Sequence, residues 1–122
     1  CGYCIMACPY NARTFVAKES SYHDTPSAWE RARYAEHTVG VVDKCDFCCD
    51  RIDGGLKKGQ VPGDDPDATP FCVISCIAQA LHFGDLDDES GKVCKLIRER
   101  GGFRLMEEME THPSVYYLPR RY

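Results

Sequence analysis

The strongest constraint on this chain is the spacing of its first cysteines. Cys1 and Cys4 are separated by two residues, Cys4 and Cys8 by three, and a proline follows at once. This pattern is the end of the bacterial iron–sulfur run C-x2-C-x2-C-x3-C-P, beginning at its second cysteine. Because the leading cysteine of the run is missing, we expect the chain to be a piece of a longer protein.

A second set of cysteines has similar spacing. It consists of Cys45-x2-Cys48 and, after a long loop, Cys72-x3-Cys76. Thiolates are soft ligands that suit iron–sulfur clusters, and two such sets indicate an electron carrier built around [4Fe–4S] clusters. The candidate cluster ligands are Cys1, Cys4, Cys8, Cys45, Cys48, Cys72 and Cys76.

Other uses of the cysteines stay open at this point. A zinc ion in a four-cysteine site is the main alternative, because the second set could close a tetrahedron. Disulfides are disfavoured, because the chain has 9 cysteines and the spacings are tight. Cys49 and Cys94 are interpreted as packed thiols rather than ligands. Four aromatic residues close to the cysteines in sequence are expected to shield a cluster from water, with ordinary core packing as the open alternative: Tyr3, Phe47, Phe71 and Phe83.

Length and charge limit the classes of function. A chain of 122 residues is expected to form one domain with a small core that metals often supplement. Its net charge of -4 gives no reason to expect a nucleic acid or an anionic membrane surface as partner. No apolar run is long enough to span a bilayer, and no signal peptide is visible, so the compartment is unknown.

The local patterns predict an α+β fold of short elements. Helices are expected over residues 3–8, 25–37 (capped by Thr25), 45–52 (ending at Gly54-Gly55), 71–76 and 93–100 (stopped by Gly101). Strands are expected over 13–17, 38–42 and 80–83, with a short strand or packing arm at 115–118. Glycine, proline and aspartate predict an irregular loop over 54–70.

An approximate internal repeat relates the two cysteine sets. Residues 4–15 resemble residues 72–83, and each segment is predicted to be a cysteine-bearing helical turn that leads into a strand. Such a duplication predicts a pseudo-two-fold arrangement.

With these motifs in place, the chain resembles the iron–sulfur subunits of molybdopterin oxidoreductases, such as polysulfide, thiosulfate, tetrathionate and dimethyl sulfoxide reductases. Residues 1–13 resemble the third cysteine group of that family, and residues 44–51 with 71–76 resemble the fourth. Residues 81–86 and 115–118 match its closing segments. One departure is Ile77, which stands where the family has a proline after the last cysteine.

The resemblance implies a ferredoxin-like α+β fold in which four cysteine groups hold four cubane clusters in two units. Groups one and two are absent here. Residues 1–122 would be a single 4Fe–4S ferredoxin-type region, with loop insertions at 14–44 and 49–71 and a C-terminal helix and tail. By resemblance, Cys1 and Cys4 would bind the group-three cluster, and Cys8 the missing group-two cluster. Cys45, Cys48 and Cys72 would bind the group-four cluster, and Cys76 the missing group-one cluster.

The same resemblance implies a non-catalytic, electron-transfer subunit. It would relay electrons between a molybdopterin catalytic subunit, with molybdenum or tungsten, and a membrane anchor or another acceptor. A bacterial or archaeal source is expected, with membrane association through partners at the periplasmic or cytoplasmic face. The alternatives are a zinc-stabilised interaction module and a free-standing two-cluster ferredoxin.

Overall fold

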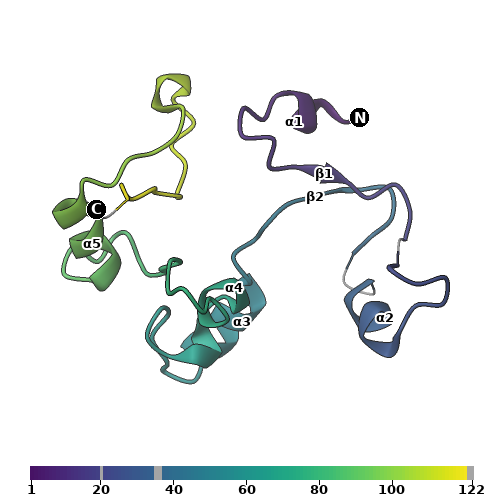
Figure 1. Ribbon diagram of the computed structural model, residues 1–122, viewed down its shortest axis with the longest axis horizontal. Helices are drawn as coiled ribbons and strands as arrows, with labels where there is room; N and C mark the ends of the chain where they lie inside the picture. The colour runs from purple at the N-terminus through teal and green to yellow at the C-terminus, as the bar shows by residue number, and fades with distance from the viewer. Residues whose placement is uncertain (20, 35–36, 121–122) are drawn as a thin grey trace. The chain divides into compact units, whose positions relative to one another are not determined.

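The computed structural model describes residues 1–19, 21–34 and 37–120. The described elements, drawn in Figure 1, are α1 (Tyr3–Met6), β1 (Thr14–Phe15), α2 (Ala28–Tyr34), β2 (Val42–Asp43), α3 (Cys49–Leu56), the 3-10 helix η1 (Pro66–Ala68), α4 (Phe71–Ile74), α5 (Lys92–Arg100) and the 3-10 helix η2 (Glu107–Met109). The chain divides into two compact units, Cys1–Asp46 and Phe47–Tyr122. Short helices and a two-stranded sheet make this a small α+β fold.

The first unit is organised by an antiparallel strand pair. Thr14 pairs with Asp43, and Phe15 pairs with Val42 (Figure 1). The strand predicted at 13–17 is confirmed, although it is shorter. The strand predicted at 38–42 begins only at Val42, because Gly40 takes a φ of 88° and turns the chain before that point.

Helix α2 begins two residues later than predicted, at Ala28. The cap is Ser27 rather than Thr25, because the Ser27 hydroxyl accepts the Glu30 N–H at 3.2 Å and the Glu30 carboxylate accepts the Ser27 N–H at 2.7 Å. This reciprocal pair is a capping box. The helix is described to Tyr34, His37 lies outside it, and residues 35–36 of the predicted helix lie outside the described residues.

In the second unit, α3 starts and ends later than the sequence predicts. Phe47 and Cys48 have φ values of 61° and 58°, so the chain is left-handed there and the helix begins only at Cys49. The Gly54-Gly55 pair, predicted to end the helix, lies inside it. Gly55 is needed for a close approach, because a Cβ there would come within 2.4 Å of the Cβ of Ala68.

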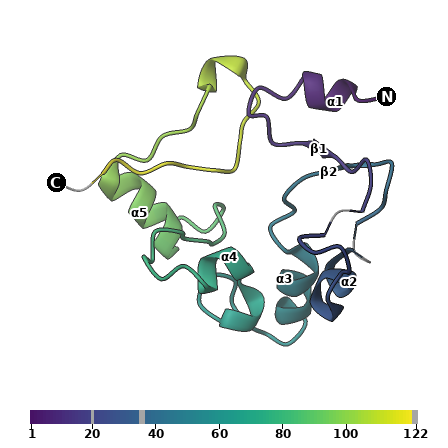
Figure 2. The same ribbon diagram turned by 45° about the vertical axis from the view of Figure 1, so that its right-hand side comes forward.

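The segment 54–70, predicted to be an irregular loop, contains the best-packed residues of the chain. Among the described residues, those that are buried are Gly55, Ala68, Thr69 and Pro70. The Thr69 hydroxyl donates to the Asp65 carbonyl at 2.7 Å and accepts the Gly63 N–H at 2.9 Å. Internal hydrogen bonds therefore fold this polar segment back against α3, as Figure 2 shows for the chain between α3 and α4.

The remaining elements complete the second unit. The predicted helices at 71–76 and 93–100 are confirmed as α4 and α5, and Gly101 ends α5 in the left-handed conformation. The tail is a packing arm: Phe103 and Tyr117 form an isolated antiparallel bridge, and the Arg100 Nη2 donates to the Pro119 carbonyl at 2.6 Å. The strand predicted at 80–83 is wrong: Phe83 packs its carbonyl against Gly63, where a Cβ would come within 2.1 Å of that oxygen.

The contact between α3 and η1 predicts opposite effects for two adjacent glycines. Gly55→Ala should lower the free energy of unfolding by about 1–3 kcal/mol, because the new methyl overlaps Ala68. Gly54→Ala should raise it by about 0.5–1 kcal/mol, because a Cβ there meets nothing within 4 Å and alanine favours the helix. Urea titration of both variants measures the difference, and equal effects would contradict this packing.

Candidate metal centre

The structure builds the same cysteine-bearing turn twice. Each copy starts with a four-residue helix, α1 or α4, whose second residue is a cysteine, Cys4 or Cys72. A second cysteine, Cys8 or Cys76, follows two residues after the helix ends. The repeated helical turn predicted from the sequence is thus confirmed, although only the first copy leads into a strand.

The two copies also share the backbone geometry that follows the second cysteine. Asn11 donates its N–H to the Cys8 carbonyl at 3.3 Å, and Gln79 donates to the Cys76 carbonyl at 3.0 Å. Asn11 and Gln79 have φ values of 51° and 49°. This left-handed residue turns the following N–H groups toward the cysteine sulfur in each copy.

These N–H groups stabilise a thiolate. The N–H of Ala12, followed by that of Tyr10, lowers the pKa of Cys8 from its ordinary value. The N–H of Ala80, which lies 3.3 Å from the Cys76 Sγ, lowers the pKa of Cys76 in the same way. Because the thiolate is the form that binds metal, these two turns fit an iron–sulfur ligand.

The seven candidate ligands are distributed over both units. Cys1, Cys4, Cys8 and Cys45 belong to the first unit, whereas Cys48, Cys72 and Cys76 belong to the second, since the boundary falls inside the Cys45-x2-Cys48 pair. All seven are exposed or half-buried free thiols. Within the described part of the chain, no three His, Cys, Asp or Glu side chains are grouped to hold a metal, so the ligand set stays a prediction.

Aromatic contacts lie beside the cysteines of the second unit. The rings of Phe47 and Phe83 are 6.1 Å apart between centroids, and Phe47 directly precedes Cys48. The ring of Phe71, which directly precedes Cys72, lies under the guanidinium of Arg51 at 4.1 Å. Aromatic contacts thus lie next in sequence to two candidate ligands, a ring pair beside Cys48 and a ring–guanidinium contact beside Cys72.

The two cysteines interpreted as packed thiols differ in the structure. Cys49 is exposed at the start of α3, so the expectation that it is packed is wrong. Cys94 is half-buried in α5, and its thiol donates to the Leu86 carbonyl at 3.3 Å. Cys94 therefore fastens α5 to the acidic turn before it, in agreement with its structural interpretation.

Arg51 is a residue that the cysteine pattern did not identify. It lies three residues after Cys48, and its guanidinium donates to the carbonyls of Thr69 and Pro66 at 2.8 Å and 2.7 Å. Its position in the cysteine-rich segment 44–51 is the only sequence signal. Its contacts depend on the folding of segment 57–70, which the sequence did not predict.

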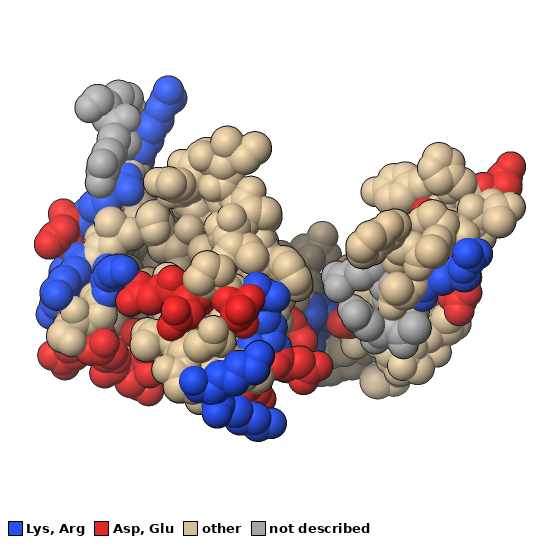
Figure 3. All heavy atoms as spheres, turned by 90° about the horizontal axis from the view of Figure 1, so that it is seen from below, with Lys and Arg blue, Asp and Glu red and all other residues tan. Residues whose placement is uncertain are grey.

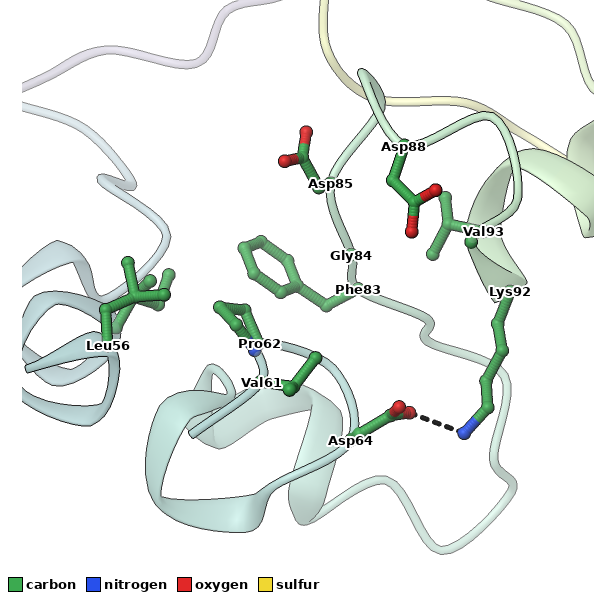
Figure 4. A pocket seen from close by; sticks show the side chains of 12 residues that line it. Leu56, Val61, Pro62, Asp64, Phe83, Gly84, Asp85, Asp88, Lys92 and Val93 are labelled. Carbon is green, nitrogen blue, oxygen red and sulfur yellow. Dashed lines mark hydrogen bonds and ion pairs between the residues drawn. The ribbon is translucent and has the colours of Figure 1, made fainter. Parts of the chain in front are cut away.

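A pocket of about 450 Å³ lies in the second unit. Figure 4 shows Phe83, Pro62 and Leu56 around it, with Lys92 pointing to Asp64 at its edge. The described residues that line it include no cysteine. The pocket separates α3 from the start of α5 and has a mainly apolar wall with a charged rim.

On the face drawn in Figure 3, Lys and Arg side chains are interspersed with Asp and Glu side chains. Of the helices in residues 1–19, 21–34 and 37–120, none has the length and apolarity to cross a bilayer.

The N–H contacts predict how Cys8 and Cys76 react in the cluster-free chain. Because these contacts lower each pKa, the thiolate persists to a lower pH than an ordinary thiolate does, and the midpoint of alkylation by iodoacetamide should be lowered accordingly. In concentrated urea the midpoint should return to the ordinary thiol value, about 8.5. Mass spectrometry of each alkylated peptide measures both curves. A midpoint that does not change on unfolding would contradict the proposed hydrogen bonds.

Several known proteins are similar to this chain over nearly all of its length. No family model matches it. It is 40% identical to a Halobacterium salinarum protein provisionally named as the iron–sulfur subunit of a dimethyl sulfoxide reductase, over 97% of this chain and 39% of that protein. It is 38% identical to a sulfite dehydrogenase subunit of Allochromatium vinosum, over 99% of this chain and 40% of the relative.

A third relative is a subunit of an enzyme named for a different substrate, menaquinone. The chain is 35% identical to the iron–sulfur cluster-binding subunit of menaquinone reductase from Nitratidesulfovibrio vulgaris, over 99% of this chain and 50% of that protein. The chain thus spans between 39% and 50% of the length of these three relatives. Over nearly all of its own length, the chain is similar to iron–sulfur subunits of oxidoreductase complexes.

Proposed function

We propose that this chain is part of an electron-transfer subunit that relays electrons between a molybdopterin catalytic subunit and a membrane anchor or another acceptor. The observation that carries the proposal is the cysteine turn that the structure builds twice, with N–H groups directed at Cys8 and Cys76. The names of the relatives, which are iron–sulfur subunits of reductases rather than catalytic subunits, support it.

The proposed cofactors are [4Fe–4S] clusters. Cys1 and Cys4 would bind the group-three cluster; Cys45, Cys48 and Cys72 would bind the group-four cluster. Cys8 and Cys76 would each bind a cluster whose other ligands lie in cysteine groups one and two. Such clusters supply one-electron redox chemistry, with a potential that depends on hydrogen bonds to sulfur and on exposure.

The chain's own residues would hold and tune these clusters. The N–H groups of Ala12 and Ala80 donate to cysteine sulfurs, which favours the charged thiolate and raises the potential of a cluster bound there. The rings of Phe47 and Phe83 would reduce the access of water to a cluster at Cys48.

The proposed partners follow from the relatives, which are named as subunits of larger assemblies. A catalytic subunit with a molybdenum or tungsten cofactor would exchange electrons with the clusters, and association with a membrane would occur through an anchor subunit. Affinity purification of the complete protein from its own host tests this: a large molybdopterin subunit should co-purify, and its absence would contradict the proposed partner.

Two substitutions test the proposed ligands. Cys48→Ala should remove about four iron atoms per polypeptide, or about one if the cluster converts to a three-iron form, because a cubane loses a ligand. Cys49→Ala is the matched control, since this exposed neighbour is not in the proposed set, and iron should not change. Iron and acid-labile sulfide are measured in the complete protein prepared without oxygen. Equal iron contents in the two variants would overturn the assignment.

A further inference from the structure

Arg51 connects the two chain segments that carry the group-four cysteines of the second unit. It lies in the first turn of α3, where its N–H donates to the Cys48 carbonyl at 3.0 Å. Its side chain crosses to the segment just before Cys72, and only 22% of it is exposed. One residue thus contacts both ends of a long interruption in the cysteine motif.

Four contacts hold the Arg51 side chain in place. The Nε donates to the Thr69 carbonyl at 2.8 Å, and Nη2 donates to the Pro66 carbonyl at 2.7 Å. The same Nη2 lies 3.6 Å from the Asp67 carboxylate, and the guanidinium lies 4.1 Å from the centroid of the Phe71 ring. These contacts use the fork, the charge and the flat face of the guanidinium, which lysine cannot reproduce together.

One of the residues that Arg51 contacts, Thr69, lies in the buried part of the segment. Thr69 is only 3% exposed, and Pro70, which follows it, is fully buried. Pro70 is the cap of α4, and its carbonyl accepts the Val73 N–H at 3.0 Å, so it determines where the helix with Cys72 begins. The hydrogen bond from Arg51 to the Thr69 carbonyl therefore holds the chain one residue before Pro70, the cap of α4.

We infer that Arg51 is a positioning residue that fastens the segment carrying Cys48 to the segment carrying Cys72, so that both sulfurs are held for one cluster. This inference rests on the proposed function and adds a residue to it. Residues 49–71, which separate the two cysteines, then form a folded segment. The Arg51 guanidinium joins its beginning to its end through the carbonyls of Thr69 and Pro66.

The test compares Arg51→Lys with Arg98→Lys in the complete, anaerobically prepared protein. Arg98 is the matched control, because its Nη2 also donates to a backbone carbonyl, that of Glu89 at 2.7 Å, but on α5. Arg51→Lys should release iron to a chelator about tenfold faster than the control, as expected when one or two net hydrogen bonds are lost. The EPR signal of one reduced cluster should change selectively, and amides in 61–70 should exchange hydrogen faster.

The outcomes separate this inference from the proposed function. Unmodified protein without iron and sulfide would overturn both. Unmodified protein with clusters, together with equal release rates and spectra for the two lysine variants, would overturn only the role of Arg51. Faster exchange in 61–70 with unchanged iron release and EPR would show a merely structural arginine and would also overturn it. If Arg51→Lys does not accumulate, Asp67→Asn, which removes only the carboxylate charge 3.6 Å from Nη2, should show a smaller effect in the same direction.

Discussion

The packing of α3 against the segment before α4 is the constraint on which the second unit depends. Gly55 allows this approach, because any side chain there would overlap Ala68. Among the described residues, the buried ones all belong to this contact or adjoin it. A chain that buries so little apolar surface resembles other small domains, which commonly gain stability from bound metal. The proposed clusters and the sparse core are thus consistent with each other.

The repeated cysteine turn links this packing to the proposed chemistry. In both copies a short helix carries one cysteine, and a left-handed residue directs N–H groups toward the sulfur of another. The departure at Ile77, which replaces the proline of the first copy, does not change this geometry. The turn therefore depends on its backbone hydrogen bonds more than on the proline.

Elements whose signals are local could be predicted from the sequence. Helix α5 has an apolar face and ends at Gly101, and α1 and α4 follow from cysteine spacing. The predictions failed where distant contacts decide the structure. Phe83 contacts Gly63 instead of pairing in a strand. The late start of α3 is a different case, because it follows from the left-handed backbone of Cys48, which is local but rare for this residue type.

In the candidate site, too, the residues with local sequence signals could be predicted, and those defined by distant contacts could not. The seven cysteines follow from spacing alone, and their assignment as ligands stays a prediction. Arg51 could not be recognised, because its partners Thr69 and Pro66 lie in a segment whose polar composition predicted an irregular loop. That segment folds through its own hydrogen bonds, such as those of the Thr69 hydroxyl. The amino-acid composition of a segment indicates how much apolar surface it can bury, but it does not indicate a network of hydrogen bonds between its polar groups.

Elemental analysis of the complete protein, purified without oxygen, tests the central claim most directly. The account predicts iron and acid-labile sulfide in equal amounts, with visible absorbance that decreases on reduction. Colourless protein that contains zinc and no sulfide would contradict it, and would favour a zinc site formed by the same thiolates.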